Sequence, residues 1–250
     1  MRYAGIDIGS RSIELVVIED GKIILTKQAD TGFDPVSAAR DIIREVDYDM
    51  ITATGYGRNL FEISFEGDTV TEIKAHAKGA RFIFPEAVTV LDIGGQDSKA
   101  IQMNGDGKVV KFEMNDRCAA GTGKFLEIMA VSLGLTIENF GSFALGAKDA
   151  LKINSMCTVF AESEVTSLVA KGHKRNEIAK GLHLSVIKRA VSMLKKVSDK
   201  GDIIFSGGVA NNTCMVEFLE DATNRKILVP ENPQMTGAIG AALITEEKMR

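Results

Sequence analysis

Residues Ala4 to Lys22 read AGIDIGSRSIELVVIEDGK, and residues Val90 to Lys108 read VLDIGGQDSKAIQMNGDGK. Each stretch begins as an apolar strand, passes through Asp-Ile-Gly, and continues as a second strand that ends at a Gly-Lys turn. Asp7 aligns with Asp92, and the spacing is maintained through the whole unit. Short strand-turn-strand units also resemble one another by coincidence, but the matched second strands favour a true repeat, which predicts two related lobes.

The segments around the two repeats alternate between helical and extended spacing. The intervening segment predicts a helix over residues 34–47, a strand over 50–54 and a helix over 72–80. After the second repeat, helices are expected over 121–133, 158–171 and 175–197, then a strand over 202–205 and a closing helix over 237–247. This alternation is typical of an α/β fold. Pro85 marks the expected boundary between lobes of residues 1–86 and 87–250, and the closing helix can pack back on the first lobe.

The composition excludes several classes of protein. Acidic residues number 34 and basic residues 30, the net charge is -4, and no dense run of Lys and Arg supplies the surface that nucleic acid requires. The N-terminal segment lacks a basic region followed by an apolar stretch, and no window reaches the length of a membrane span. We therefore expect a cytoplasmic protein without nucleic-acid or membrane partners. The three cysteines are too few for a disulfide framework.

Each Asp-Ile-Gly turn has the chemistry of a phosphate-binding hairpin. A glycine after a buried strand lets backbone N–H groups approach a polyphosphate, and the preceding carboxylate can face its Mg²⁺. Asp7 and Asp92 are the expected Mg²⁺ ligands, directly or through water, while Gln96 and Asp97 could hold an attacking water. These four residues are the predicted catalytic set, although each polar side chain could instead only satisfy the backbone of its turn.

A third glycine-containing segment follows the strand expected over 202–205. Ser206 to Asn212 reads SGGVANN, and a flat adenine could lie on its glycine backbone. A loop with Gln234 then leads into TGAIGAAL, residues 236–243, whose small side chains can pack tightly at a hinge or simply in a core.

The order of these motifs resembles the acetate kinase, sugar kinase and actin superfamily over nearly the whole chain. DIGS, DIGGQDS, SGGVANN and TGAIGAAL look like the first phosphate loop, the second phosphate loop, the adenosine loop and the connecting helix. The resemblance implies two ribonuclease H-like lobes of the actin and sugar-kinase type, with a nucleotide cleft between them. The residues expected to contact ATP or ADP are Gly9, Ser10, Arg11, Ser12, Gly94, Gly95, Gln96, Gly121, Glu162, Ser206, Gly207, Gly208, Val209, Asn211 and Gln234.

Two further stretches carry a more specific resemblance. NDRCAAGTGKFLE at Asn115 to Glu127 and MCTVFAESEV at Met156 to Val165 look like the ATP-dependent activators of 2-hydroxyacyl-CoA dehydratases and their benzoyl-CoA reductase relatives. The resemblance implies an ATPase that donates single electrons to a separate acyl-CoA dehydratase or reductase. These motifs do not distinguish a dehydratase client from a reductase client.

Two of the cysteines stand before predicted helices. Cys118 and Cys157 occupy positions where a helix N-terminus favours the thiolate, yet spacing alone favours buried thiols. A cubane cluster needs four thiolates, which a two-fold dimer with two cysteines per subunit would supply. The resemblance implies one 4Fe-4S cluster between two subunits, held by Cys118 and Cys157, with Cys214 left in the core. The histidines lack metal-ligand spacing, are expected at the surface or as caps, and receive no role: His76, His173 and His183.

Nucleotide exchange is expected to change lobe closure, because ADP lacks the γ-phosphate contacts that ATP makes. Closure could then reorient the cysteine-bearing helices, with a reduced ferredoxin or flavodoxin as the expected electron source. One alternative is a small-molecule kinase or acetate-kinase-like phosphotransferase without a cluster. Another is an actin-type scaffold without redox function. The cluster content of anaerobically purified protein separates both alternatives from the electron donor.

Overall fold

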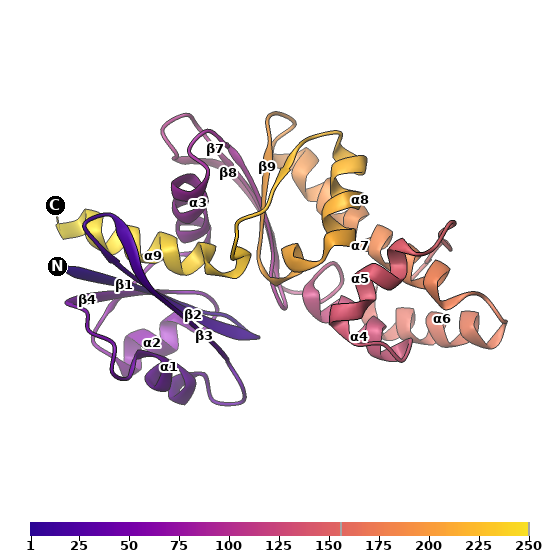
Figure 1. The fold of residues 1–250 in the computed structure, drawn as a ribbon, viewed down its shortest axis with the longest axis horizontal. Coiled ribbons are helices and arrows are strands. Elements are labelled where there is room, and N and C mark those ends of the chain that lie inside the picture. Colours follow the sequence, from indigo (N-terminus) through magenta and orange to yellow (C-terminus); the bar gives the residue numbers. More distant parts are fainter. Residues whose placement is uncertain (156, 250) are drawn as a thin grey trace. The chain divides into compact units, whose positions relative to one another are not determined.

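The computed structural model describes residues 1–155 and 157–249 (Figure 1). Met156, the first residue of the second activator-like stretch, lies outside the described residues. The chain divides into two compact units, and the first contains Met1–Val90, Ile101–Phe112 and Pro230–Arg250. The second contains Leu91–Ala100 and Glu113–Val229. This grouping differs from a single boundary after residue 86, because the chain enters the first unit three times.

The first unit is a five-stranded sheet with helices on both faces (Figure 1). The strand order is β3-β2-β1-β4-β5; β1 pairs antiparallel with β2 and parallel with β4. Its elements are β1 (Arg2–Ile8), β2 (Ser12–Glu19), β3 (Lys22–Asp30), α1 (Pro35–Ile43), β4 (Met50–Thr54), α2 (Arg58–Ser64), β5 (Asp68–Thr69), α3 (Glu72–Ile83), the short η2 (Pro233–Met235) and α9 (Thr236–Met249).

Strand β2 shows why this sheet needs two covering layers. Its side chains alternate between the faces, and apolar residues occupy both sets. Leu15 and Val17 pack with α1 and α2, whereas Val16 and Ile18 pack with α9. A strand that is buried on both faces therefore reads as an unbroken apolar run.

Small residues allow α9 to approach the sheet and α3 closely. A Cβ added to Gly5 of β1 would overlap the backbone of Ala238, and one added to Gly79 of α3 would overlap that of Thr236. Gly240 is similarly close to Ala75 of α3. The glycines and alanines of TGAIGAAL are thus required by close packing, which places the start of α9 beside the end of β1.

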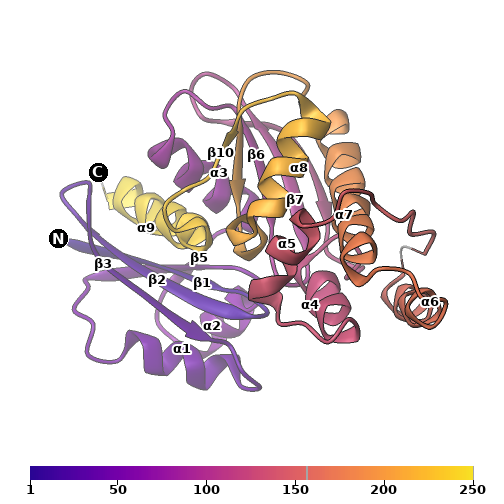
Figure 2. The same ribbon diagram turned by 45° about the vertical axis from the view of Figure 1, so that its right-hand side comes forward.

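The second unit contains most of a second five-stranded sheet, in the order β10-β9-β6-β7-β8, and the longest helix. Its elements are β6 (Thr89–Ile93), β7 (Ser98–Met103), β8 (Val109–Asn115), α4 (Gly123–Ser132), α5 (Ile137–Leu145), α6 (Thr158–Ala170), α7 (Arg175–Val197), β9 (Ile203–Ser206), η1 (Gly208–Asn211), α8 (Thr213–Thr223) and β10 (Ile227–Leu228). The unit boundary runs through β6, β7 and β8. Figure 2 shows α7 and α8 side by side, and these two helices contact each other.

The predicted α/β class with two related hairpins is confirmed. The strand at 50–54 and the helix at 175–197 coincide with β4 and α7. Helix α5 was not predicted, because Gly141 interrupts its sequence; a Cβ there would overlap the side chain of Asn212. No single helix in the described ranges has the length and apolar composition of a membrane span; α4 and α5 together have them, but are bent by 79°.

Candidate functional site

The first hairpin is a tight turn between β1 and β2. The Gly9 N–H donates to the Ser12 carbonyl at 3.0 Å, and the Thr31 hydroxyl donates to the Gly9 carbonyl at 2.8 Å. The Gln234 amide donates to the Ser12 hydroxyl at 3.2 Å, which joins two predicted nucleotide contacts from opposite ends of the chain. Ser10 and Arg11 are exposed at the tip of the turn. The hairpin is therefore anchored at its base and presents its tip outward.

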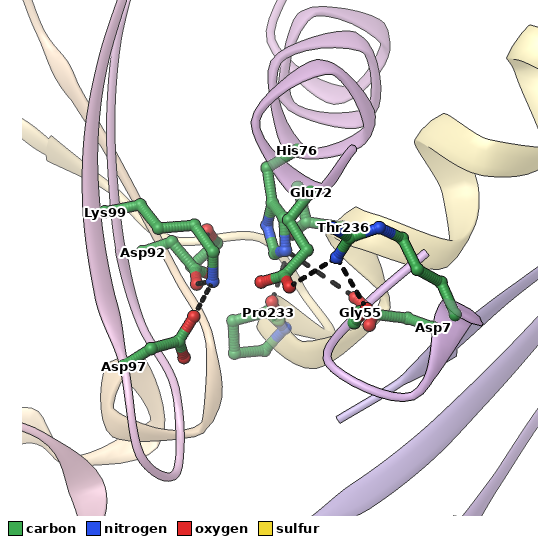
Figure 3. A network of polar contacts seen from close by, with 11 residues as sticks. Asp7, Gly55, Glu72, His76, Asp92, Asp97, Lys99, Pro233 and Thr236 are labelled. Carbon is green, nitrogen blue, oxygen red and sulfur yellow. Dashed lines mark hydrogen bonds and ion pairs between the residues drawn. The ribbon is translucent and has the colours of Figure 1, made fainter. Parts of the chain in front are cut away.

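Asp7 lies at the end of β1, buried to 7% exposure. Gly55 and Gly237 flank its carboxylate, since a Cβ on Gly55 would overlap Oδ1 and one on Gly237 would overlap Oδ2. His76 of α3 places Nε2 at 3.6 Å from Asp7 Oδ2, and Figure 3 shows these two side chains facing each other. The expectation of a surface or capping role for His76 was wrong, because the residue is 5% exposed and faces a predicted catalytic carboxylate.

Glu14 shares the row of side chains that contains Asp7. The two residues are direct partners in the β1–β2 ladder, and the Gln28 amide of β3 donates to Glu14 at 3.1 Å. Burial, followed by the negative charge of Asp7, raises the pKa of Glu14 to about 8. Glu14 is accordingly mostly protonated at neutral pH, so it adds little charge next to Asp7.

The second hairpin has the same backbone plan and a different charge arrangement. Asp92 is 2% exposed, accepts from Lys99 Nζ at 3.2 Å and accepts from the Ser206 hydroxyl at 2.8 Å. Asp97 also forms an ion pair with Lys99, as Figure 3 shows. Gln96 is exposed at the turn. The two predicted catalytic aspartates of this hairpin therefore share one buried lysine, which the sequence analysis did not single out.

The adenosine-type segment lies against the second hairpin. Gly207 has a positive φ of 83°, and a Cβ there would overlap the Ile93 carbonyl, so glycine is required. Gly208 to Asn211 form η1, and the Asn212 side chain accepts from the Cys214 N–H at the start of α8. The structure thus brings Ser206 and Gly207, two predicted nucleotide contacts, next to Asp92.

His183 supports Asn212 from α7. Its Nδ1 lies 2.8 Å from the Ala179 carbonyl and its Nε2 lies 3.0 Å from the Asn212 amide nitrogen. Burial lowers the pKa of His183 to about 4, so the ring is neutral, with Nδ1 donating and Nε2 accepting. The surface expectation was wrong for this histidine too, whereas His173 is exposed.

The Cys118 turn is attached directly to the second hairpin. Two N–H groups from the start of α4, those of Gly123 and Lys124, donate to the carbonyls of Gly94 and Gly95 at 2.9 and 2.8 Å. Cys118 precedes α4, as predicted, but the helix begins only at Gly123 and these two N–H groups bind the hairpin rather than the thiol. The helix start is thereby fixed to the predicted phosphate loop.

Side chains from β8 and α7 hold the backbone around Cys118. The Asn115 amide donates to the Cys118 carbonyl at 2.9 Å, and the Arg189 guanidinium donates to the Ala120 carbonyl at 3.0 Å. Gly121 has a φ of 86° and leaves room for the Arg189 side chain. The Cys118 thiol itself is exposed.

Cys157 occupies a different position, as the N-cap residue of α6. Glu164, two turns into that helix, accepts backbone N–H bonds from Asn154 at 3.0 Å and Ser155 at 2.8 Å. Burial alone would raise the pKa of Glu164, but these hydrogen bonds hold it below its ordinary value. The segment before Cys157 is therefore tied to α6 by a carboxylate. Glu162, a predicted nucleotide contact, is exposed on the same helix.

The three thiols differ in accessibility. Cys118 and Cys157 are exposed, whereas Cys214 is buried in the core of the second unit, as predicted. Burial raises the pKa of Cys214 to about 12, which makes it a poor thiolate ligand. Within the described ranges, no three His, Cys, Asp or Glu side chains converge as a metal site.

Known proteins similar to this chain include activators of acyl-CoA dehydratases. The chain is 43% identical over 256 residues to the activator of lactoyl-CoA dehydratase from Anaerotignum propionicum, covering 99% of this chain and 98% of that protein. It is similar, with a TM-score of 0.90 and 36% identity, to the activator of the 2-hydroxyisocaproyl-CoA dehydratase from Clostridium difficile with bound ADPNP, over 99% of this chain and 95% of that one.

A second solved structure is equally similar. Component A of the (R)-2-hydroxyglutaryl-CoA dehydratase from Acidaminococcus fermentans matches with a TM-score of 0.91 and 35% identity, over 99% of this chain and 98% of that one. Residues 4–245 match the model of one protein family. The chain therefore belongs to the BadF/BadG/BcrA/BcrD ATPase family, and its fold is the two-lobed, actin-like fold of these ATPases.

Proposed function

We propose that this ATPase is a one-electron donor that activates a 2-hydroxyacyl-CoA dehydratase or a related acyl-CoA reductase. A 4Fe-4S cluster would be shared by two copies of the chain, each contributing Cys118 and Cys157. Reduced ferredoxin or flavodoxin would supply the electron, and ATP and water would be converted to ADP and phosphate at each transfer. We place the protein in the cytoplasm. The three relatives described above are all dehydratase activators or components, which favours a dehydratase as the client.

One observation carries this proposal: the exposed Cys118 turn is hydrogen-bonded through the start of α4 to a nucleotide-type hairpin. The bonds from Gly123 and Lys124 to Gly94 and Gly95 join the two predicted sites through the backbone. A change in the hairpin that accompanies loss of the γ-phosphate would therefore move the Cys118 turn.

The donor groups of the chain fit the two inorganic partners. Exposed thiols are suitable iron ligands, and a 4Fe-4S cluster supplies one-electron transfer. Four thiolates require two copies of the chain, because Cys214 is buried. Asp7 and Asp92 are the carboxylates proposed for Mg²⁺, directly or through water, and Gln96 and Asp97 are proposed to hold the attacking water.

The proposal is tested by anaerobic purification followed by iron and sulfide analysis and light scattering. The expected result is a brown dimer with about four iron and four sulfide per two chains. Cys118→Ala and Cys157→Ala should each lose the colour and the iron, while the matched control Cys214→Ala should retain both. Colourless, monomeric wild-type protein with ATPase activity would contradict the electron-donor function and favour a phosphotransferase without a cluster.

A further inference from the structure

The carboxylate of Asp7 has little freedom except on the side that faces α3. Gly55 and Gly237 approach its two oxygens so closely that neither position could carry a Cβ. His76, on the second turn of α3, presents Nε2 to Oδ2 at 3.6 Å (Figure 3). Both residues are buried, with side chains that are 7% (His76) and 11% (Asp7) exposed. Both groups are therefore largely shielded from bulk water. A slight shortening of the distance between Nε2 and Oδ2 would create a hydrogen bond.

Arg58 and Glu72 connect the turn after β4 to α3, the helix that carries His76. The Arg58 guanidinium donates to the Gly55 carbonyl at 3.0 Å and pairs with Glu72 at 3.5 Å. Glu72 and His76 are four residues apart on α3 and therefore project from the same face, as Figure 3 shows. These contacts connect the turn after β4 to α2 and α2 to α3, the helix from which His76 meets Asp7.

We propose that His76 is a positioning residue for ATP hydrolysis, acting through Asp7. By contacting Oδ2, the imidazole sets the plane of the Asp7 carboxylate and hence the direction of its other oxygen. The inference rests on the proposed role of Asp7 in the reaction. It extends that role to a histidine which neither the composition nor the spacing of the sequence indicated.

The surroundings favour positioning over a charge effect or simple packing. Arg58, the cation of the neighbouring helix α2, is already paired with Glu72. His76 is thus the polar side chain that meets Oδ2 from α3.

The test compares two substitutions of similar size in the full-length, anaerobically purified protein. Gln places an amide nitrogen near the position of imidazole Nε2, whereas Asn places it near Nδ1. His76→Asn should lower kcat for ATP hydrolysis roughly 10- to 100-fold, the scale expected for a misdirected catalytic group, with KM for ATP changed less than about threefold. His76→Gln should retain kcat within about threefold. His173→Gln, at an exposed position, is the matched control and should equal the wild type.

Each other outcome overturns the proposal. Equal losses in both variants, loss of ADP binding or a lowered melting temperature in both, or a rise in KM with unchanged kcat would assign His76 to packing or nucleotide binding. Unchanged kcat in both would leave it without a role. Asp7→Asn separates this failure from that of the proposed site: if Asp7→Asn hydrolyses ATP at the wild-type rate, the role of Asp7 itself is wrong. If only Asp7→Asn is inactive, His76 alone was misassigned.

Discussion

The two Asp-Ile-Gly hairpins share a backbone plan but differ in charge at one equivalent position. Glu14 stands seven residues after Asp7, and Lys99 stands seven residues after Asp92. Glu14 and Lys99 are both almost completely buried and both lie next to the aspartate of their own hairpin. In the second hairpin the aspartate is neutralised by an ion pair. In the first hairpin a mostly protonated acid accompanies it.

This difference shows that the two halves of the repeat are not chemically equivalent. Asp92 is held by Lys99 and Ser206, so much of its charge is already balanced within the second unit. Asp7 has no such lysine and meets His76. Of the two predicted Mg²⁺ ligands, Asp7 is therefore the stronger candidate, because its carboxylate is less completely balanced by protein groups.

The largest expected effect comes from breaking the buried pair of the second hairpin. Lys99→Met leaves Asp92 buried without its ammonium partner and should lower the free energy of unfolding by about 3–5 kcal/mol. Chemical denaturation monitored by circular dichroism measures the loss. Adding Asp92→Asn to Lys99→Met should recover a large part of it, because the more deeply buried of the two carboxylates that pair with Lys99 is then uncharged. If Lys99→Met were as stable as the wild type, the ion pair between Lys99 and Asp92 would not be needed for folding.

Giving the first hairpin the buried lysine of the second should have the next largest effect. Glu14→Lys would place an ammonium beside Asp7 that competes with Mg²⁺ for the carboxylate. We expect ATP hydrolysis at saturating ATP to fall roughly 10- to 100-fold, with partial recovery at high Mg²⁺. Glu14→Gln is the matched control and should retain hydrolysis within a few fold. Equal rates in Glu14→Lys and the wild type would indicate that Asp7 does not act through its charge.

The smallest expected effect is a pH dependence of stability. The pKa of Glu14 is about 8 in the folded chain and 4.5 ordinarily, so between these values only the folded state retains the proton. Its contribution to the free energy of unfolding is therefore present at low pH and is lost as pH rises from about 4.5 through about 8.

Glu14→Gln should remove this dependence. We compare the free energy of unfolding of Glu14→Gln with that of the wild type, both free of nucleotide and metal. Between pH 5 and pH 8 the difference should shift in favour of the variant by on the order of 2 kcal/mol. Thermal or urea unfolding across that range measures the gain. Glu231→Gln, at an exposed position in the same unit, should show no such trend. Parallel pH profiles for Glu14→Gln and the wild type would contradict the burial argument.

Several parts of this site were visible in the sequence. The Asp-Ile-Gly repeat predicted both hairpins, and the apolar run before SGGVANN predicted β9 and its glycine turn. His76 was missed because a single histidine in an amphipathic helix carries no spacing signal. The role of Lys99 had a detectable signal, since aligning the two repeats places it opposite Glu14. Helix α5 was missed because the reason for Gly141 lies in Asn212, which is distant in sequence.

The sequence by itself determined the α/β class and the twin turns, because these follow from local periodicity and glycine, and its resemblance to the activator family separated Cys214 from the other cysteines. Only the tertiary structure decided which groups neighbour each aspartate and how Cys118 is connected to Gly94 and Gly95. Those contacts join segments that are far apart along the chain. Their energies depend on burial and distance, and neither quantity exists until the strands and helices have packed.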